Sequence, residues 1–163
     1  MGRNVVIGLI VLLGLGALIY WAARPKEEEL SVTPTPSVEQ TLEENFKYQI
    51  PEGFEKAELN DVSGGTGSAI ASRKYESGSF NHAVLADLPD PESGSFYEGW
   101  LVRGKEGDEN FAYISTGIMS MAKGGYMLEF ESSVDYSDYT GVVVSLEKAN
   151  DKNPEKHVLE GSF

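Results

Sequence analysis

The sequence predicts an all-β fold, an antiparallel β-sandwich domain preceded by one N-terminal transmembrane helix and a linker. Three observations indicate this arrangement. Residues 46–163 alternate short aromatic and branched segments with clusters of Gly, Asn, Asp and Ser, and carry no helical apolar period. The first 23 residues contain a long uncharged apolar run, and the stretch between is rich in prolines and acidic residues. Such a stretch has little to bury and favours a spacer.

Val5 to Ala23 is the expected transmembrane helix. About 19 uncharged residues span roughly 29 Å as a helix, against a hydrocarbon core of about 30 Å. Tyr20 and Trp21 lie at its end, as interfacial aromatic residues do. They also occupy positions where signal peptidase requires small residues, so we expect an uncleaved signal anchor. The lipid bilayer is therefore an expected partner through Val5 to Ala23, in the cytoplasmic membrane.

The expected orientation depends on length, because charge does not decide it. Arg3 on one side nearly balances Arg24 and Lys26 on the other. Only four residues precede the apolar run and one long polar region follows it. We therefore expect residues 1–4 in the cytoplasm and a single-pass protein with its C-terminal domain outside.

The polar region divides into a linker and a domain. Residues 24–45 read as an acidic, proline-containing linker, in which a short helical turn near Val38 to Glu44 is an option. Residues 46–163 have the commonest length of a single domain and are expected to form the β-sandwich. Candidate strands are Lys47 to Ile50, Glu55 to Asn60, Ser68 to Tyr75, His82 to Leu88, Phe96 to Arg103, Phe111 to Ser115, Tyr126 to Ser132, Gly141 to Glu147 and Lys156 to Glu160.

The segment Phe96 to Arg103 is apolar on much of both faces. Phe96, Trp100 and Val102 fall on one face, and the intervening positions contribute Tyr97 and Leu101 to the other. Such a strand is typical of the centre of a sheet. We expect Trp100 to be buried between two packed sheets.

The second half of the chain contains several short motifs in a definite order. They are Leu88-Pro89-Asp90-Pro91, Tyr97-Glu98-Gly99-Trp100-Leu101, Phe111 with Ser115-Thr116-Gly117, Val142 to Glu147, and Pro154 with Val158-Leu159-Glu160-Gly161. From about His82 to Phe163 this order resembles the extracytoplasmic C-terminal domain of the bacterial anti-sigma-K factor family. The resemblance implies a regulatory, non-catalytic β-sandwich outside the membrane.

Two segments depart from the family pattern. Full members place a cytoplasmic sigma-binding domain before the transmembrane helix, whereas only Met1-Gly2-Arg3-Asn4 precede it here. We therefore expect no sigma-factor sequestration by this chain alone. The family's Gly-Gly-Ser segment reads Lys148-Ala149-Asn150-Asp151-Lys152-Asn153 here.

Charge and composition narrow the function classes. The net charge of −13 argues against nucleic acid as a partner, and the absence of cysteine excludes disulfides and Cys-ligated metals. His82 and His157 are the only histidines, and neither has a second ligand at metal-binding spacing. We expect no catalytic, cofactor-binding or metal-binding residues, and so no enzyme.

Glycine-rich and oxygen-rich loops have ordinary structural interpretations. Gly64 to Ser68 is expected to be a hairpin turn, because no lysine and no helix follow it as a phosphate loop requires. Asp87 to Glu92, Asp135 to Asp138 and Asn150 to Asn153 contain acidic groups but do not match a calcium-loop pattern. We expect solvated turns.

Two functions of different classes remain. The first is a membrane-anchored extracytoplasmic regulatory, sensory or interaction module that binds an unknown protein. The alternative is a surface adhesion or carbohydrate-binding module, whose ligand would contact exposed aromatic residues such as Tyr97, Tyr113, Tyr136 and Tyr139. Exposure of these rings on one face favours the alternative, and burial argues against it.

Overall fold

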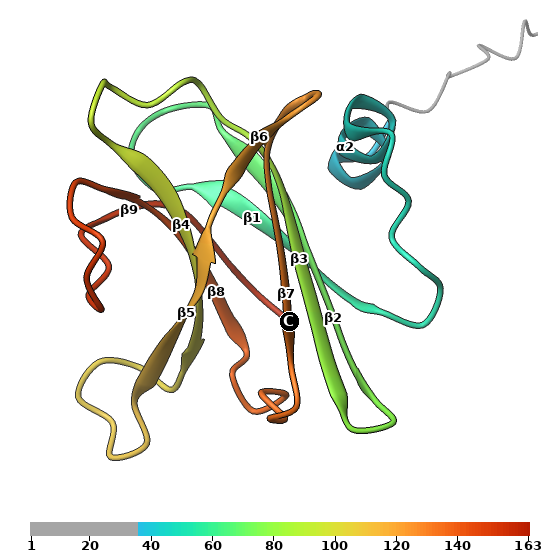
Figure 1. The fold of residues 1–163 in the computed structure, drawn as a ribbon, viewed down its shortest axis with the longest axis vertical. Coiled ribbons are helices and arrows are strands. Elements are labelled where there is room, and N and C mark those ends of the chain that lie inside the picture. The colour runs from blue at the N-terminus through green and yellow to red at the C-terminus, as the bar shows by residue number, and fades with distance from the viewer. Residues whose placement is uncertain (1–35) are drawn as a thin grey trace, which may run out of the picture. The chain divides into compact units, whose positions relative to one another are not determined.

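The computed structural model describes residues 36–163, which form an antiparallel β-sheet with one helix packed on it (Figure 1). The hydrogen-bonded order of the nine strands is β5-β4-β8-β9-β1-β2-β3-β7-β6. The elements are α2 (Val38–Phe46), β1 (Glu55–Asp61), β2 (Ser68–Glu76), β3 (Ser79–Asp87), β4 (Phe96–Arg103), β5 (Ala112–Ile118), β6 (Ser120–Ala122), β7 (Gly125–Ser132), β8 (Gly141–Glu147) and β9 (Lys156–Ser162).

The two ends of this strand order are joined by one continuous segment. β5 and β6 are separated only by Met119, yet β5 pairs with β4 and β6 pairs with β7. The segment therefore crosses from one edge of the sheet to the other (Figure 1). As a result the sheet curls on itself into a nearly closed barrel.

The prediction of an antiparallel all-β domain is confirmed, but two separate packed sheets are not found. Residues 36–163 instead form a single sheet in which β9 and β1 connect the strands that a sandwich would divide. The alternation of apolar and polar residues predicts an inner and an outer face in either architecture. It therefore could not distinguish a sandwich from a barrel.

The barrel interior holds the main hydrophobic core. Phe80, Tyr97, Leu101 and Leu128 are buried in it, and the rings of Tyr97 and Tyr126 meet edge to face at 5.0 Å. Small residues on β2 and β3 allow these rings to fit. They are Ala69, Ala71 and Ala86.

A second cluster lies on the outer face of β2 and β3, where α2 covers the sheet. Leu42 and Phe46 of the helix pack with Ile50, Ile70 and Leu85. The i, i+4 spacing of Leu42 and Phe46 places both side chains on the covered side of the helix, and Ile50 joins them from the segment that follows it. The expected linker, residues 24–45, thus ends in a helix that belongs to the folded domain.

Local chemistry explains why α2 begins and ends where it does. Ser37 accepts a hydrogen bond from the Gln40 N–H, and the Gln40 side chain accepts one from the Ser37 N–H, each at 3.2 Å. This reciprocal pair is a capping box. Lys47 ends the helix in the left-handed region with φ 53°. The prediction of a strand over Lys47 to Ile50 is therefore wrong.

The other eight expected strands are present, β4 and β8 with the predicted bounds and the other six with shifted ends. β6 was not expected because its three residues lack a visible alternation. The predicted transmembrane segment Val5 to Ala23 and the cytoplasmic residues 1–4 lie outside the described residues. No helix within residues 36–163 has the length and hydropathy needed to cross a membrane.

Candidate functional site

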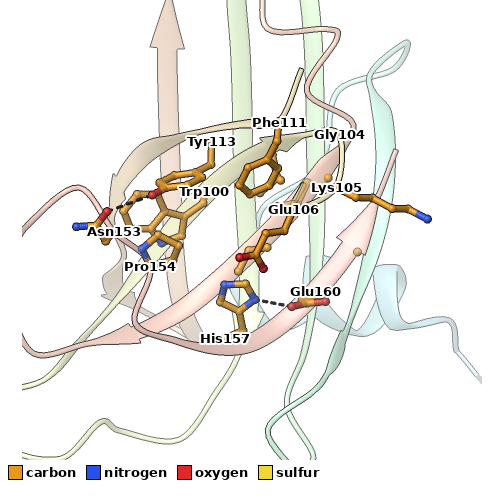
Figure 2. A pocket seen from close by; sticks show the side chains of 15 residues that line it. Trp100, Gly104, Lys105, Glu106, Phe111, Tyr113, Asn153, Pro154, His157 and Glu160 are labelled. Carbon is orange, nitrogen blue, oxygen red and sulfur yellow. Dashed lines mark hydrogen bonds and ion pairs between the residues drawn. The ribbon is translucent and has the colours of Figure 1, made fainter. Parts of the chain in front are cut away.

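An open groove lies on the outer face of β4, β5, β8 and β9 (Figure 2). Its volume is about 730 Å³. Residues far apart in the sequence line it, since β4 pairs with both β5 and β8, and β8 pairs with β9. They include Trp100, Lys105, Glu106, Phe111, Tyr113, Val143, Asn153, Pro154, His157 and Glu160.

One wall of the groove is aromatic. The rings of Phe111 and Tyr113 meet edge to face at 5.8 Å, and those of Tyr113 and Trp100 at 5.9 Å. Phe111 is 36% exposed, whereas Trp100 is 1% exposed. Phe111 is therefore the accessible ring, and Trp100 supports it from beneath through Tyr113.

The burial of Trp100 is confirmed, but its surroundings differ from the expectation. Leu101 points into the barrel, so Trp100 points to the outer face. There its indole N–H donates to Ser145 Oγ at 2.7 Å. Trp100 is thus covered by the groove wall and not sandwiched between sheets.

The opposite side of the groove carries charge. His157 Nδ1 lies 2.5 Å from Glu160 Oε1. In Figure 2 the side chains of Glu106 and His157 point toward each other, and Lys105 points away from the groove. The accessible polar surface of the groove is therefore mainly acidic, with one imidazole.

The loop between β8 and β9 forms a third wall. The Tyr113 hydroxyl donates a hydrogen bond to Asn153 Oδ1 at 3.1 Å, which connects the loop to β5. The Glu155 N–H donates to Glu147 Oε1 at 2.9 Å. The Glu155 carboxylate in turn accepts from the N–H groups of Lys148 and Ala149, each at 3.2 Å. The loop that departs from the family pattern is thus a closed hydrogen-bonded turn.

The two histidines lie in different environments. His157 is exposed at the groove, whereas His82 is buried within β3 and not at a strand end. Burial lowers the pKa of His82 to about 4, although its Nδ1 lies 2.9 Å from Ser72 O, and nearby Arg73 lowers the pKa further. His82 is therefore a neutral core residue near neutral pH. Residues 36–163 contain no group of three or more His, Asp or Glu side chains arranged to hold a metal ion.

The Gly64 to Ser68 segment is the hairpin turn between β1 and β2, as expected. The Asp61 carboxylate accepts hydrogen bonds from the N–H groups of Gly65, Ser63 and Gly67. These bonds, of which the one from the Gly65 N–H has the largest effect, hold the pKa of Asp61 below its ordinary value. The backbone donors that a phosphate loop would offer to an anion are thus occupied.

Acidic groups in the other loops also have partners in the protein. Asp90 accepts a hydrogen bond from the Tyr126 hydroxyl at 2.8 Å, and Asp138 pairs with Arg103 at 2.6 Å. Asp151 accepts from the Asn153 N–H at 2.8 Å. These contacts describe structured turns.

The four tyrosines of the adhesion hypothesis do not share one exposed face. Tyr97 is buried in the core. Tyr136 and Tyr139 are partly buried and pack against the core, and their two rings meet edge to face with centroids 5.4 Å apart. Only Tyr113 lines the groove. The sequence reasoning overlooked its neighbour Phe111 as a contact residue, although an aromatic residue beside the polar turn before β5 was a visible signal.

Comparison with known proteins gives one family. The family model described as "Anti-sigma-K factor rskA, C-terminal" matches residues 5–158. No curated protein and no solved structure matches the chain. The family match extends the resemblance seen from His82 onward toward the N-terminus. Since it covers most of the sequence, the chain belongs to the family of the anti-sigma-K factor C-terminal region.

Proposed function

We propose that this chain is a membrane-anchored, non-catalytic regulatory module whose β domain lies outside the cytoplasmic membrane. In this proposal the domain recognises a protein partner through the groove. Family membership supports the regulatory role, because an anti-sigma factor is a regulatory protein. The apolar run Val5 to Ala23 supports the membrane anchor.

The observation that carries the recognition role is the exposed Phe111 ring beside Glu106 and Glu160 in one groove. Aromatic anchors carry much of the binding energy of protein interfaces, and charged groups beside them select a partner of complementary charge. The chain carries a net charge of −13, and Lys105 points away from the groove. The partner segment that complements this surface presents an apolar side chain and a basic one.

The lining of the groove also supports a non-catalytic role. The 15 residues that line it include no serine, threonine or cysteine, so His157 has no aliphatic hydroxyl or thiol to activate there, and the Tyr113 hydroxyl is bonded to Asn153. Its imidazole is paired with Glu160. A histidine and carboxylates at an aromatic surface suit a binding role.

Site-specific photo-crosslinking in cells of the native host tests this proposal. A photoreactive amino acid at position 111 of the full-length chain is expected to form a covalent adduct with another polypeptide. The same amino acid at position 75 is the control, since Tyr75 is 42% exposed on β2, away from the groove. Equal adduct yields at both positions contradict the proposal.

Charge reversal makes the test specific. Glu106→Lys is expected to reduce the adduct at position 111 several-fold, whereas Glu58→Lys, on the exposed side of β1, is expected to leave it unchanged. An adduct that increases with Glu106→Lys contradicts a basic partner segment. Adducts with carbohydrate alone favour the adhesion hypothesis.

A further inference from the structure

Two buried carboxyl groups lie next to each other beneath the groove wall. Glu98 is 3% exposed and Glu147 is 0% exposed. In the register of β4 and β8, Glu98 lies opposite Ser145 and Glu147 lies opposite Phe96. The two glutamates are therefore diagonal neighbours on one face of the sheet, within reach of long side chains.

Each carboxyl has one oxygen with a hydrogen-bond donor and one without. Ser145 Oγ accepts the Trp100 N–H, so its own proton is directed to Glu147 Oε1. Glu98 Oε1 pairs with the hydroxyl of Ser115. The Oε2 atoms of both glutamates are buried and have no hydrogen-bond partner within residues 36–163. Two desolvated oxygens are therefore without a partner, and a proton or a cation bound there would remove the cost of burying them.

The surrounding elements supply acidic groups and hydroxyls to this pair. β5 contributes Ser115, and the loop above contributes Asp151. On β9, His157 lies opposite Ser145 in the register, but it pairs with Glu160. The remaining charged groups of the loop are Lys148, Lys152 and Glu155, and none forms an ion pair with Glu98 or Glu147 in the described part of the chain.

We propose that Glu98 and Glu147 hold one proton between them at pH values where exposed glutamates are already ionised. The pair then carries a single negative charge beneath the loop of residues 148–155. Ionising both groups would place two like charges side by side out of water, with an unsatisfied oxygen on each. Because the groups interact, the proton belongs to the pair and not to one residue.

The electrostatic surroundings support the same conclusion. Burial raises the pKa of Glu98, the hydrogen bond from Ser115 opposes this effect, and the charges of Glu147 and Asp151 raise the pKa further. Glu147 Oε1 accepts two hydrogen bonds, from Ser145 and from the Glu155 N–H, whereas Glu98 Oε1 accepts only the one from Ser115. Glu98 is therefore the member of the pair that retains the proton most readily.

The shared proton also affects partner binding in the groove, an effect that rests on the proposed function. Glu147 holds the loop through the Glu155 N–H, and Asn153 and Pro154 of this loop line the groove. Loss of the proton places a second charge under that wall and favours its release into water. Partner binding is then expected to weaken as the pH rises through the titration of the pair.

Trp100 provides a direct optical readout, because it is linked to Glu147 through Ser145. The full-length chain in detergent, with Trp21→Phe, retains Trp100 as its single tryptophan. Its fluorescence is followed from about pH 4 to about pH 9, without added metal. We expect a transition with its midpoint above the ordinary pKa of glutamate.

Three variants test the assignment. Glu98→Gln is expected to abolish the transition, and the exposed Glu129→Gln is the matched control that leaves it unchanged. Glu147→Gln removes the neighbouring charge and is expected to move the midpoint to lower pH. This variant shows a titration only if it folds, so it separates loss of the proton from loss of the structure.

Two results would overturn the shared proton. One is a transition that persists in Glu98→Gln. The other is a transition that calcium or magnesium chloride shifts and EDTA restores, which would identify a cation at the pair. Neither result bears on crosslinking at position 111, so failure of this inference is distinguishable from failure of the proposed function.

Discussion

Trp100 and Ser145 are joined across the β4–β8 pair by a hydrogen bond of 2.7 Å between the indole nitrogen and the hydroxyl oxygen. Both residues are buried on the outer face of the barrel. The bond connects the aromatic wall of the groove to the carboxylate that holds the loop wall. The groove and its loop are therefore one structural unit.

Deleting the indole is expected to cost much more than deleting the hydroxyl. Trp100→Ala should lower the free energy of unfolding of the full-length chain by about 3 to 5 kcal/mol, the usual cost of a large buried aromatic residue. Ser145→Ala leaves the indole N–H without its acceptor and should cost about 1 to 3 kcal/mol. Urea unfolding measures both, with the exposed Ser120→Ala on β6 as the control. A loss below about 1 kcal/mol for Trp100→Ala would contradict its burial.

The hairpin before β7 depends on glycine at one position. Gly125 has φ 142°, and a Cβ there would lie 2.2 Å from Ala86 O. Gly125→Ala should therefore destabilise the domain by about 2 to 5 kcal/mol, from strain and from overpacking.

Gly78 provides the matched control for that substitution. It has φ 83°, but a Cβ there would meet no atom within 4 Å. Gly78→Ala should cost only the local strain, about 1 to 2 kcal/mol. Thermal unfolding compares the two variants, and equal losses would show that the close approach at Gly125 is unimportant.

His82 is expected to make stability depend on pH below neutrality. Its pKa is about 4 in the folded protein, mainly through burial, against an ordinary value of 6.5. The unfolded chain therefore binds more protons between these values, and stability falls as the pH drops through this window. The expected loss from neutral pH to about pH 4 is about 3 kcal/mol.

Two matched variants isolate this histidine. His82→Gln should flatten the dependence of unfolding free energy on pH between about pH 4 and 6.5, whereas the exposed His157→Gln should retain it. Glu98 contributes with the opposite sign, because a raised carboxyl pKa stabilises the fold at low pH and loses this effect as the pH rises. If the unfolding free energy of His82→Gln still depended steeply on pH in this window, a group other than His82 would be the cause.

The strands could be predicted because alternation of side chains is a local property. Tyr126, Leu128 and Phe130 alternate with Glu129 and Glu131, and β7 forms there. The helix α2 had readable signals too, in the Ser37 to Gln40 capping pair and the spacing of Leu42 and Phe46. Proline and acidic content outweighed them in the interpretation of the segment as a linker.

Closure of the barrel and assembly of the groove depend on long-range pairing. Nothing local indicates that the segment around Met119 crosses from β4 to β7. The proximity of Glu98 to Glu147 likewise follows from the β4–β8 register. A glutamate between Phe96 and Trp100 on one face of an apolar strand was nevertheless a visible signal of a buried acidic group.

Location is the central claim, because an extracytoplasmic regulatory domain must lie outside the membrane that Val5 to Ala23 is proposed to span. Protease added to intact spheroplasts, with a tag after Phe163 for detection, measures this directly. The expected result is a full-length protein before treatment and digestion of the β domain after it, while a cytoplasmic marker stays intact. Protection of the domain until the membrane is permeabilised, or a mature chain starting near Arg24, would contradict the claim.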